Sequence, residues 1–434
     1  MERQYTNEIE PSKDRVRVSG WAHEVRDIGK LVFVILRDRE GTVQITFKKD
    51  NLDDKEFDRA KDIGREDVID VMGSVEENDE APNGFEIKPE EFEILTEAKS
   101  PLPLEIRENI DSEMETRLDN RFMDLRKKEI HAIFSFRDKV ITSLREWYDE
   151  NEFLEIHTPI ISKGGAEGGA TLFPVEYYSN KAYLRQSPQL YKQMLMASGF
   201  DKVYEVGPSF RAEEFATSRH VSEFTQWDVE LAFIDGVDDV MDVLEDSMKS
   251  LLKKMKKRGQ HELGVLDEDI EVPEEDFPRI TFDKARKILR EEYNHVPEEK
   301  GDLDTEGEKL LGEHFQEKGH DFVFVLGYPN EKFYYMQEIE EDEAASRKFD
   351  LLYKGQEISS GGQREHRLDV LLDAMEEQDV DKSNFKFYLE AFKYGMPPHG
   401  GFGVGLDRVV TKMIELDNIK ESILFPRDPD RVAP

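Results

Sequence analysis

The sequence predicts a multidomain α+β protein in which a small β-barrel precedes a larger antiparallel sheet flanked by helices. Three observations support this prediction. Short strand patterns fill the first 100 residues, interrupted by one helical stretch. A proline-punctuated linker, AKSPLPLE at 98–105, follows them. Beyond the linker, long amphipathic helical patterns alternate with strand patterns of period two.

The first domain is expected over residues 1–100. Its strand patterns are Arg15–Gly20, Leu31–Asp38, Gly41–Phe47, Val68–Val75 and Phe85–Ile94, with a helix at Asp54–Ile63. Five strands with a helix between the third and the fourth are typical of an OB-fold barrel, whose strand face binds oligonucleotides. Arg26, Phe33 and Gln44 are candidates on that face, because aromatic rings stack on bases and amides read their edges. Taken alone, Phe33 fits a core residue better than a stacking residue.

Two amphipathic helices are expected in the second domain, at Ile130–Asn151 and Val237–Arg258. The second ends in KKMKKR, a basic run that either stabilises the helix C-terminus or contacts nucleic acid. Phe322–Leu326 reads as a buried strand.

A hairpin at 203–233 carries the clearest chemical pattern. On its second strand, Thr225, Trp227, Val229 and Leu231 share one face, and Phe224, Gln226, Asp228 and Glu230 share the other. The first strand and the loop supply Arg211, Glu213, Arg219 and His220. A guanidinium matches phosphate oxygens, an aromatic ring stacks on adenine, and a carboxylate binds an ammonium group. The hairpin therefore predicts a site for a nucleotide beside an amino acid.

This hairpin resembles motif 2 of the class II aminoacyl-tRNA synthetases, in the form found in archaeal-type aspartyl-tRNA synthetases. FLEIHTP, around 153–160, resembles motif 1, which implies a homodimer. GMPPHGGFGVGLDRVVTKMI, around 395–415, resembles motif 3. WAHEVRDIGKLVFVILRDREGTVQIT, at 21–46, resembles the anticodon-binding barrel of the family. The resemblance implies an anticodon domain at 1–100, a hinge at 101–130 and a catalytic domain at 131–434.

The resemblance implies ATP-dependent formation of aspartyl-adenylate, followed by transfer of aspartate to the tRNA 3′ end. Arg211 and Arg408 are the expected catalytic residues, on the α- and γ-phosphates. The expected ATP-binding residues are Arg211, Glu213, Arg219, His220, Val221, Phe224, Glu357, Gly405 and Arg408. The expected aspartate-binding residues are Glu167, Gln189, Lys192, Arg211, Gln226, Asp228, Ser360 and Arg364. Lys192 and Arg364 are expected to form a doubly cationic pocket that prefers aspartate to asparagine.

The resemblance also places Mg²⁺ on Glu357 and Ser360, with Asp350 as possible support, because hard oxygen donors suit this ion. Arg26, Phe33 and Gln44 are expected to contact the anticodon. In the family that the chain resembles, enzymes selective for tRNA(Asp) have Trp and Lys at two barrel positions. This sequence has His23 and Pro82 there. They suggest a non-discriminating enzyme that also charges tRNA(Asn) for a later amidation, with an amidotransferase as possible downstream partner.

Other interpretations stay open. An enzyme strictly specific for tRNA(Asp) would share every motif, and an asparaginyl-tRNA synthetase would share most of them but lack Lys192. An asparagine-synthetase-like relative would lack the barrel. An OB-fold protein with an inactive synthetase domain would lose residues such as Arg211, Glu357 and Arg408.

Composition sets further bounds. The 434 residues include 97 acidic and 60 basic side chains, a formal charge of -37. Acid spread along the whole chain suggests a halophilic source, because molar salt screens self-repulsion. Such a charge opposes nucleic-acid binding, so recognition would rest on stacking and base edges. The chain has no cysteine, no long apolar run and no signal-peptide pattern, so a cytoplasmic protein without membrane contact is expected.

Overall fold

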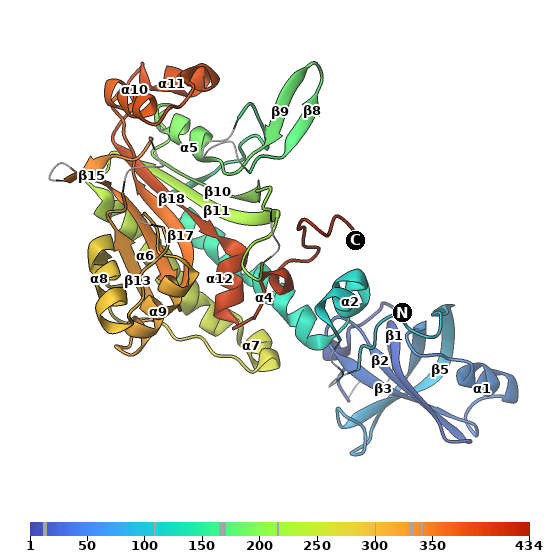
Figure 1. The fold of residues 1–434 in the computed structure, drawn as a ribbon. Coiled ribbons are helices and arrows are strands. Elements are labelled where there is room, and N and C mark those ends of the chain that lie inside the picture. The colour runs from blue at the N-terminus through green and yellow to red at the C-terminus, as the bar shows by residue number, and fades with distance from the viewer. Residues whose placement is uncertain are drawn as a thin grey trace. The chain divides into compact units, whose positions relative to one another are not determined.

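The computed structural model describes residues 1–11, 15–107, 110, 112–164, 171–214, 217–299, 301–329, 334–339 and 342–434. The chain forms two compact units, Met1–Glu105 and Ile106–Pro434. The division falls inside the segment 101–130, which the sequence suggested as a hinge. Figure 1 shows the first unit in blue.

The first unit is a closed five-stranded barrel, as predicted. Its strands are β1 (Val16–Asp27), β2 (Leu31–Arg37), β3 (Thr42–Lys48), β4 (Val68–Glu77) and β5 (Phe85–Thr96), in the order β1-β2-β3-β5-β4. A short 3-10 helix, η1 (Thr6–Glu8), precedes them. The helix α1 (Asp54–Lys61) lies between β3 and β4, and the Asp53 side chain caps it by accepting from the backbone N–H of Glu56. Val32, Val34 and Leu36 alternate inward along β2 and fill the barrel.

The second unit contains an eight-stranded sheet in the order β12-β13-β16-β17-β18-β11-β10-β6. The strands are β6 (Leu154–Glu155), β10 (Lys202–Phe210), β11 (Glu223–Ala232), β12 (Arg279–Thr281), β13 (Phe322–Leu326), β16 (Lys348–Tyr353), β17 (Gln356–Gln363) and β18 (His399–Gly405). Pairing is antiparallel except where β6 meets β10 and β12 meets β13. Figure 1 shows β10, β11, β17 and β18 side by side.

Helices and short strands surround this sheet. The helices are α2 (Met114–Asp119), α3 (Arg121–Asp124), α4 (Lys128–Glu150), α5 (Gln189–Met196), α6 (Val237–Arg258), α7 (Gln260–Leu266), α8 (Phe282–Glu292), α9 (Thr305–Gln316), α10 (Leu368–Glu377), α11 (Lys386–Phe392) and α12 (Leu406–Met413), with 3-10 turns η2 (Lys382–Phe385) and η3 (Ile419–Ser422). The strands β7 (Ile161–Ser162), β8 (Pro174–Tyr177) and β9 (Asn180–Leu184) form a small sheet, and β14 (Glu338–Ile339) pairs with β15 (Asp342–Ser346).

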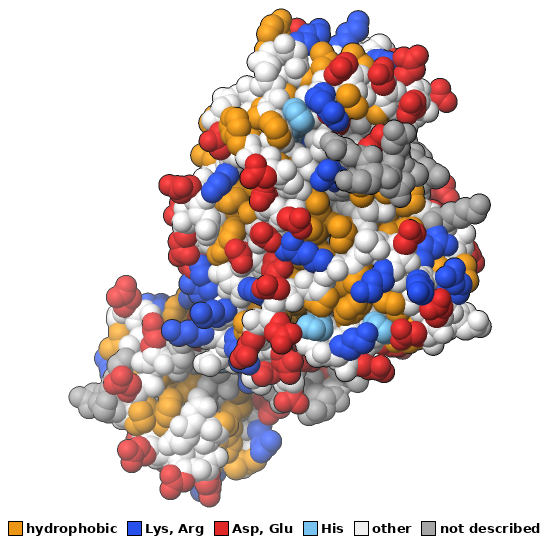
Figure 2. Space-filling view, turned by 90° about the vertical axis from the view of Figure 1, so that its left-hand side faces the viewer, with side chains coloured by type: hydrophobic (Ala, Val, Ile, Leu, Met, Phe, Trp, Pro, Cys, Tyr) orange, Lys and Arg blue, Asp and Glu red, His pale blue; other side chains and the backbone are white. Residues whose placement is uncertain are grey.

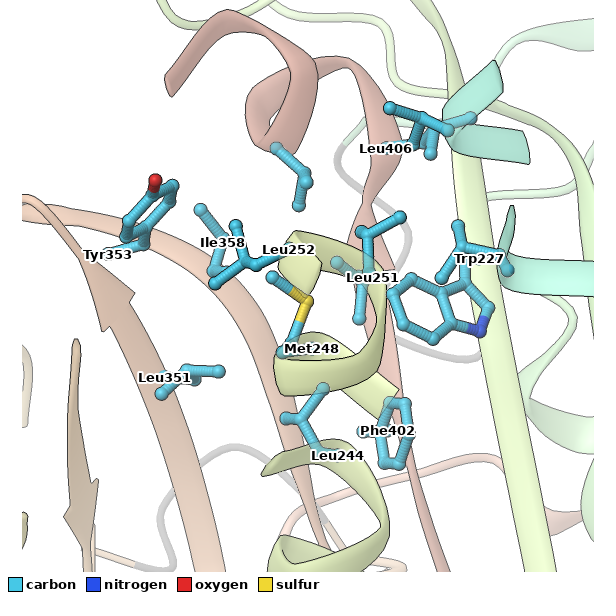
Figure 3. Close-up of a cluster of buried hydrophobic side chains, with 14 of the residues drawn as sticks. Trp227, Leu244, Met248, Leu251, Leu252, Leu351, Tyr353, Ile358, Phe402 and Leu406 are labelled. Atoms are coloured by element: carbon cyan, nitrogen blue, oxygen red, sulfur yellow. The ribbon is translucent and has the colours of Figure 1, made fainter. Parts of the chain in front are cut away.

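The main core lies between one face of the large sheet and the helices α4 and α6. Figure 3 shows Leu244, Met248, Leu251 and Leu252 of α6 packed near Trp227 and Phe402. Trp227 is fully buried, as the alternation along its strand predicted. Burying side chains of this size stabilises the fold by about 2 kcal/mol each. The sheet is therefore anchored on this face, which leaves its other face to form a site.

The basic run at the end of α6 is largely paired within the unit. Lys254 and Arg258 both contact Glu146 on α4, and Lys256 donates to the carbonyl of Ile270. These contacts favour the structural interpretation of KKMKKR. Acidic side chains are scattered over the face seen in Figure 2 rather than gathered in one patch. No helix in the described ranges has the length and apolar composition needed to cross a lipid bilayer.

Candidate active site

A cavity of about 360 Å³ lies on the second face of the large sheet. Arg211, directly after β10, and Arg408, from the first turn of α12, line this one cavity, as predicted. The other predicted residues on its wall are Gln189, Glu213, Arg219, His220, Val221, Phe224, Gln226, Asp228, Glu357, Ser360, Arg364 and Gly405. Lys192 is not on the wall, and Glu167 lies outside the described residues.

One end of the cavity gathers arginines around an aromatic ring, and we call it the phosphate end. The guanidinium carbon of Arg211 lies 5.5 Å from the ring centre of Phe224. Arg408 donates to the carbonyl of Glu357 at 2.9 Å. Asp407, buried beside it, accepts from the Thr225 backbone N–H and from Arg137, which fixes the first turn of α12 against β11 and α4. The guanidinium groups are therefore held by the fold and face the cavity.

The other end, which we call the amino-acid recess, rests on buried ion pairs. Arg364 donates to Glu230 at 3.1 Å and to the carbonyl of Gly401 at 2.9 Å. Burial acts to raise the pKa of Glu230, but Arg364 and Lys192 outweigh it and hold that pKa below its usual value. Burial raises the pKa of Asp228, against the opposing effect of Lys192. Glu230 therefore remains charged beneath the recess.

Lys192 lies behind this recess and not in it. Its ammonium group donates to Asp228 at 3.0 Å and to the carbonyls of Val229 and Phe402 at 3.2 and 2.9 Å. These contacts use all three of its donors. The expectation of a doubly cationic pocket is therefore wrong, because the charges of Asp228 and Glu230 balance those of Lys192 and Arg364. Lys192 acts on the recess by holding Asp228.

A chain of buried hydrogen bonds fixes Gln189, which the recess exposes to the cavity. His399 Nδ1 pairs with the carbonyl of Pro397, so its Nε2 accepts from the amide of Gln193. Gln193 Oε1 in turn accepts from Gln189 Nε2 at 2.9 Å and from Tyr388 at 3.2 Å. The amide oxygen of Gln189 then points toward Arg364. The sequence analysis did not single out Gln193, because its role depends on contacts that only the fold creates.

The glycines of the GFGVG strand give this site its depth. Gly401, Gly403 and Gly405 of β18 stand opposite Glu230, Asp228 and Gln226 of β11. A Cβ at Gly401 would collide with the Glu230 carboxylate and with the carbonyl of Val229. The glycines therefore belong to a strand and not to a dinucleotide-binding loop.

Oxygen donors for a divalent cation lie between the two ends. Asp350 and Ser360 are directly opposite one another on β16 and β17, and Glu357 lies on the same hairpin. Asp350 pairs with Lys348 at 2.8 Å, while its Oδ1 is buried and has no hydrogen-bond partner in the described part of the chain. Despite burial, Arg408 and Lys348 keep the pKa of Glu357 below its usual value. A buried carboxylate oxygen without a donor fits a Mg²⁺ ligand.

Glu308, on α9, is a residue that the sequence analysis missed. Its carboxylate pairs with Arg219 and accepts from the backbone N–H of Glu357 at 2.9 Å. Burial, with the nearby charge of Glu357, raises the pKa of Glu308 to about 7. Nothing local to Glu308 distinguishes it from the chain's many other acidic residues.

The barrel residues singled out in the sequence lie on one strand face. Arg26 is directly opposite Phe33 between β1 and β2, and Gln44 is on the adjacent β3. Phe33 is half-buried, and the Gln44 amide donates to Glu86 at 3.1 Å. His23 Nδ1 lies 2.6 Å from Arg37, whereas Pro82 is exposed. These positions are open enough for contact with a ligand.

A barrel of the OB type and an antiparallel sheet bearing two arginines at one cavity are the features of a class II aminoacyl-tRNA synthetase. Comparison with known proteins agrees. A family model described as tRNA synthetases class II (D, K and N) matches residues 113–429, and an OB-fold nucleic acid binding domain matches residues 16–95. The chain belongs to this class II synthetase family.

Individual relatives match over the full length. The chain is 47% identical to an aspartate–tRNA(Asp) ligase of Pyrococcus furiosus, over 99% of both chains. It is 46% identical to an aspartate–tRNA(Asp/Asn) ligase of Archaeoglobus fulgidus, over 100% of both. Among solved structures, asparaginyl-tRNA synthetase from Pyrococcus horikoshii with asparaginyl-adenylate is 34% identical, with a TM-score of 0.92 and full coverage of both chains.

Proposed function

We propose that this protein is an aspartate–tRNA ligase that forms aspartyl-adenylate from ATP and then transfers aspartate to tRNA. The observation that carries the proposal is the shared cavity of Arg211 and Arg408, with Arg364 set in the adjoining recess. The chain's full-length similarity to aspartate–tRNA ligases supports aspartate as the amino acid.

In the first step, the aspartate α-carboxylate attacks the α-phosphorus of ATP. Arg211 holds the α-phosphate, Arg408 holds the γ-phosphate, and Phe224 stacks on adenine. Glu213 reads the adenine amino group, with Val221 and Gly405 completing the nucleotide wall and His220 and Arg219 near the phosphates. Among the described residues of the wall, no side chain is an obvious general base, so catalysis rests on positioning and charge neutralisation.

The aspartate side-chain carboxylate pairs with Arg364, whose orientation Glu230 fixes. Gln189, Gln226, Asp228 and Ser360 surround the rest of the amino acid, with Asp228 toward the ammonium group. Glu357 and Ser360, with Asp350, would hold Mg²⁺, which supplies charge neutralisation on the phosphates when bound.

We further propose that the enzyme aspartylates both tRNA(Asp) and tRNA(Asn). Relatives with each specificity match almost equally well, so His23 and Pro82 carry this choice. Arg26, Phe33 and Gln44 would contact the anticodon. The product on tRNA(Asn) would require a downstream amidotransferase.

The test is aminoacylation of purified tRNA(Asp) and tRNA(Asn) with labelled aspartate at molar KCl, the salt that a -37 chain favours. We expect both tRNAs to be charged. Charging of tRNA(Asp) alone would leave a strictly specific aspartate–tRNA ligase. The same assay is run with labelled asparagine, because the chain is similar to a solved asparaginyl-tRNA synthetase. Charging with asparagine would identify an asparaginyl enzyme.

The enzyme is also proposed to work as a cytoplasmic homodimer. Leu154, Ile160 and Ile161, in and beside the motif 1 segment, expose 47%, 39% and 44% of their surface, which is a feature of an uncovered interface. Light scattering of the full chain at high salt should give twice the monomer mass.

A further inference from the structure

A second cavity, of about 380 Å³, adjoins the phosphate end of the first. Arg219 and Arg408 line both cavities and so form a shared wall. Whatever leaves the first cavity past these two guanidinium groups reaches the second. None of the functional assignments above uses this space.

Five cations line the second cavity, although the chain carries far more acid than base. They are Arg219, Lys309, Lys354, Arg408 and Lys412, against the acidic lining residues Glu313 and Asp417. Three of the cations have partners outside the lining, since Glu308 pairs with Arg219, Glu415 with Lys354 and Glu357 with Arg408. With these partners included the charges balance, and Lys309 and Lys412 are the lining cations for which no ion pair is found among the described residues.

Lys412 is the most informative of the five. It lies one helical turn after Arg408 on α12, so both side chains lie on the same face of that helix. It is half-buried, and within the described ranges it has no hydrogen-bond or ion-pair partner. Burial, with the nearby charges of Arg219 and Lys354, lowers its pKa against the opposing effect of Glu415. Glu415 and Glu308 act on this ammonium group from a distance, and no carboxylate of the described residues forms an ion pair with it.

The wall between the cavities is fixed by the fold. A Cβ at Gly312 of α9 would collide with the backbone of Gly355, in the turn between β16 and β17. This close approach docks α9 on the hairpin that carries Glu357, and it brings Glu308 within reach of Arg219. The cationic lining is therefore preformed.

We propose that the second cavity binds inorganic pyrophosphate as it leaves the first. The inference rests on the proposed function. When the aspartate carboxylate oxygen bonds to the α-phosphorus, the bond from that phosphorus to the bridging oxygen breaks, and its electron pair stays on pyrophosphate. The released anion passes the shared wall and is held by Lys412 and Lys309. Polyanions of this kind are bound by clustered Lys and Arg side chains.

The test is the reverse reaction of the full chain, in which aspartyl-adenylate and pyrophosphate give ATP. Lys412→Met should raise the KM for pyrophosphate about fivefold or more, as loss of a charge-assisted contact does. The KM for ATP in the forward direction should stay within about twofold, since phosphate binding there rests on the arginines. Lys253→Met, an exposed lysine of α6 that lines neither cavity, is the charge-matched control.

Each outcome has one meaning. An unchanged KM for pyrophosphate in Lys412→Met and in Lys309→Met overturns the proposal, and Lys309→Met serves alone if the first variant does not fold. If the KM for ATP rises as much as the KM for pyrophosphate, Lys412 belongs to the ATP site. If only the KM for tRNA rises, the cavity binds tRNA phosphates. Either result overturns the proposal. A wild-type protein that makes no ATP from aspartyl-adenylate contradicts the proposed function itself.

Discussion

At the amino-acid recess, Lys192, Asp228, Glu230 and Arg364 are at most 4% exposed and pair with one another, whereas at the phosphate end Arg219 and Arg408 keep 19% and 20% of their side-chain surface. In the recess the charged side chains are already paired with one another, so a ligand must fit their fixed positions. At the phosphate end Arg219 and Arg408 also have carboxylate partners, Glu308 and Glu357, but their exposed surface can still contact a ligand. The difference suggests that amino-acid choice rests on rigidity and phosphate binding on available charge.

The largest effect on chemistry is expected at the phosphate end. Arg211→Ala should lower the rate of aspartate-dependent ATP–pyrophosphate exchange about a thousandfold, or about 4 kcal/mol, because it removes a donor aimed at the reacting phosphate. The urea unfolding midpoint should stay close to that of the wild type. Near-normal exchange would show that Arg211 does not act on the phosphate.

A matched pair of lysines tests the comparison through stability. Lys192→Met leaves Asp228 buried without its cation and should cost about 3–5 kcal/mol of unfolding free energy. Lys412→Met removes a cation that has no ion pair among the described residues, and it should change stability by less than about 0.5 kcal/mol. Urea denaturation measures both. Equal losses would mean that the recess and the second cavity beside the phosphate end are not built differently.

Protonation offers a third test of the rigid recess. Burial lowers the pKa of His399 from 6.5 to about 4. Between these values the unfolded chain binds more protons than the folded one, so folding stability falls as the pH falls. At pH 5 the loss attributable to His399 is about 2 kcal/mol.

His399→Gln should remove this contribution while keeping an acceptor for Gln193. The measurement is the difference in unfolding free energy between pH 7.5 and pH 5 for both proteins. An identical difference in wild type and variant would show that His399 is not held neutral in the folded state.

The smallest expected effect concerns the chain that orients Gln189. Gln193→Met keeps the side-chain shape but removes its hydrogen bonds to Gln189, Tyr388 and His399. The KM for aspartate should rise about tenfold, close to the worth of one buried hydrogen bond, with the kcat and the KM for ATP nearly unchanged. A uniform loss of activity would indicate damage to the fold instead of a loss of positioning.

Local patterns predicted much of the fold and of the cavity wall. The period-two alternation around Trp227 separated core from site, and α6 and β13 have the bounds that hydrophobic periodicity predicted. Residues in recognisable motifs, such as Arg211 and Arg408, were placed correctly on one cavity. In each case the feature was predictable because it depends on the spacing of residues close together in the sequence.

Residues whose role depends on long-range packing were missed or misread. Glu308 reaches Glu357 only because α9 docks on a distant hairpin. Lys192 was expected to face the ligand, but the carbonyls of Val229 and Phe402, from two neighbouring strands, draw its ammonium group behind Asp228. No local pattern reports which side of a buried carboxylate a lysine will occupy.

The glycine at 401 also limits how the enzyme could be redesigned. Because the Glu230 carboxylate already occupies the space where a side chain from β18 would stand, that strand cannot be remodelled without dismantling the anchor of Arg364. Substitutions that make room for a bulkier amino acid must therefore be placed in α5 or in the segment around Tyr335, with Gly401 and Glu230 left unchanged.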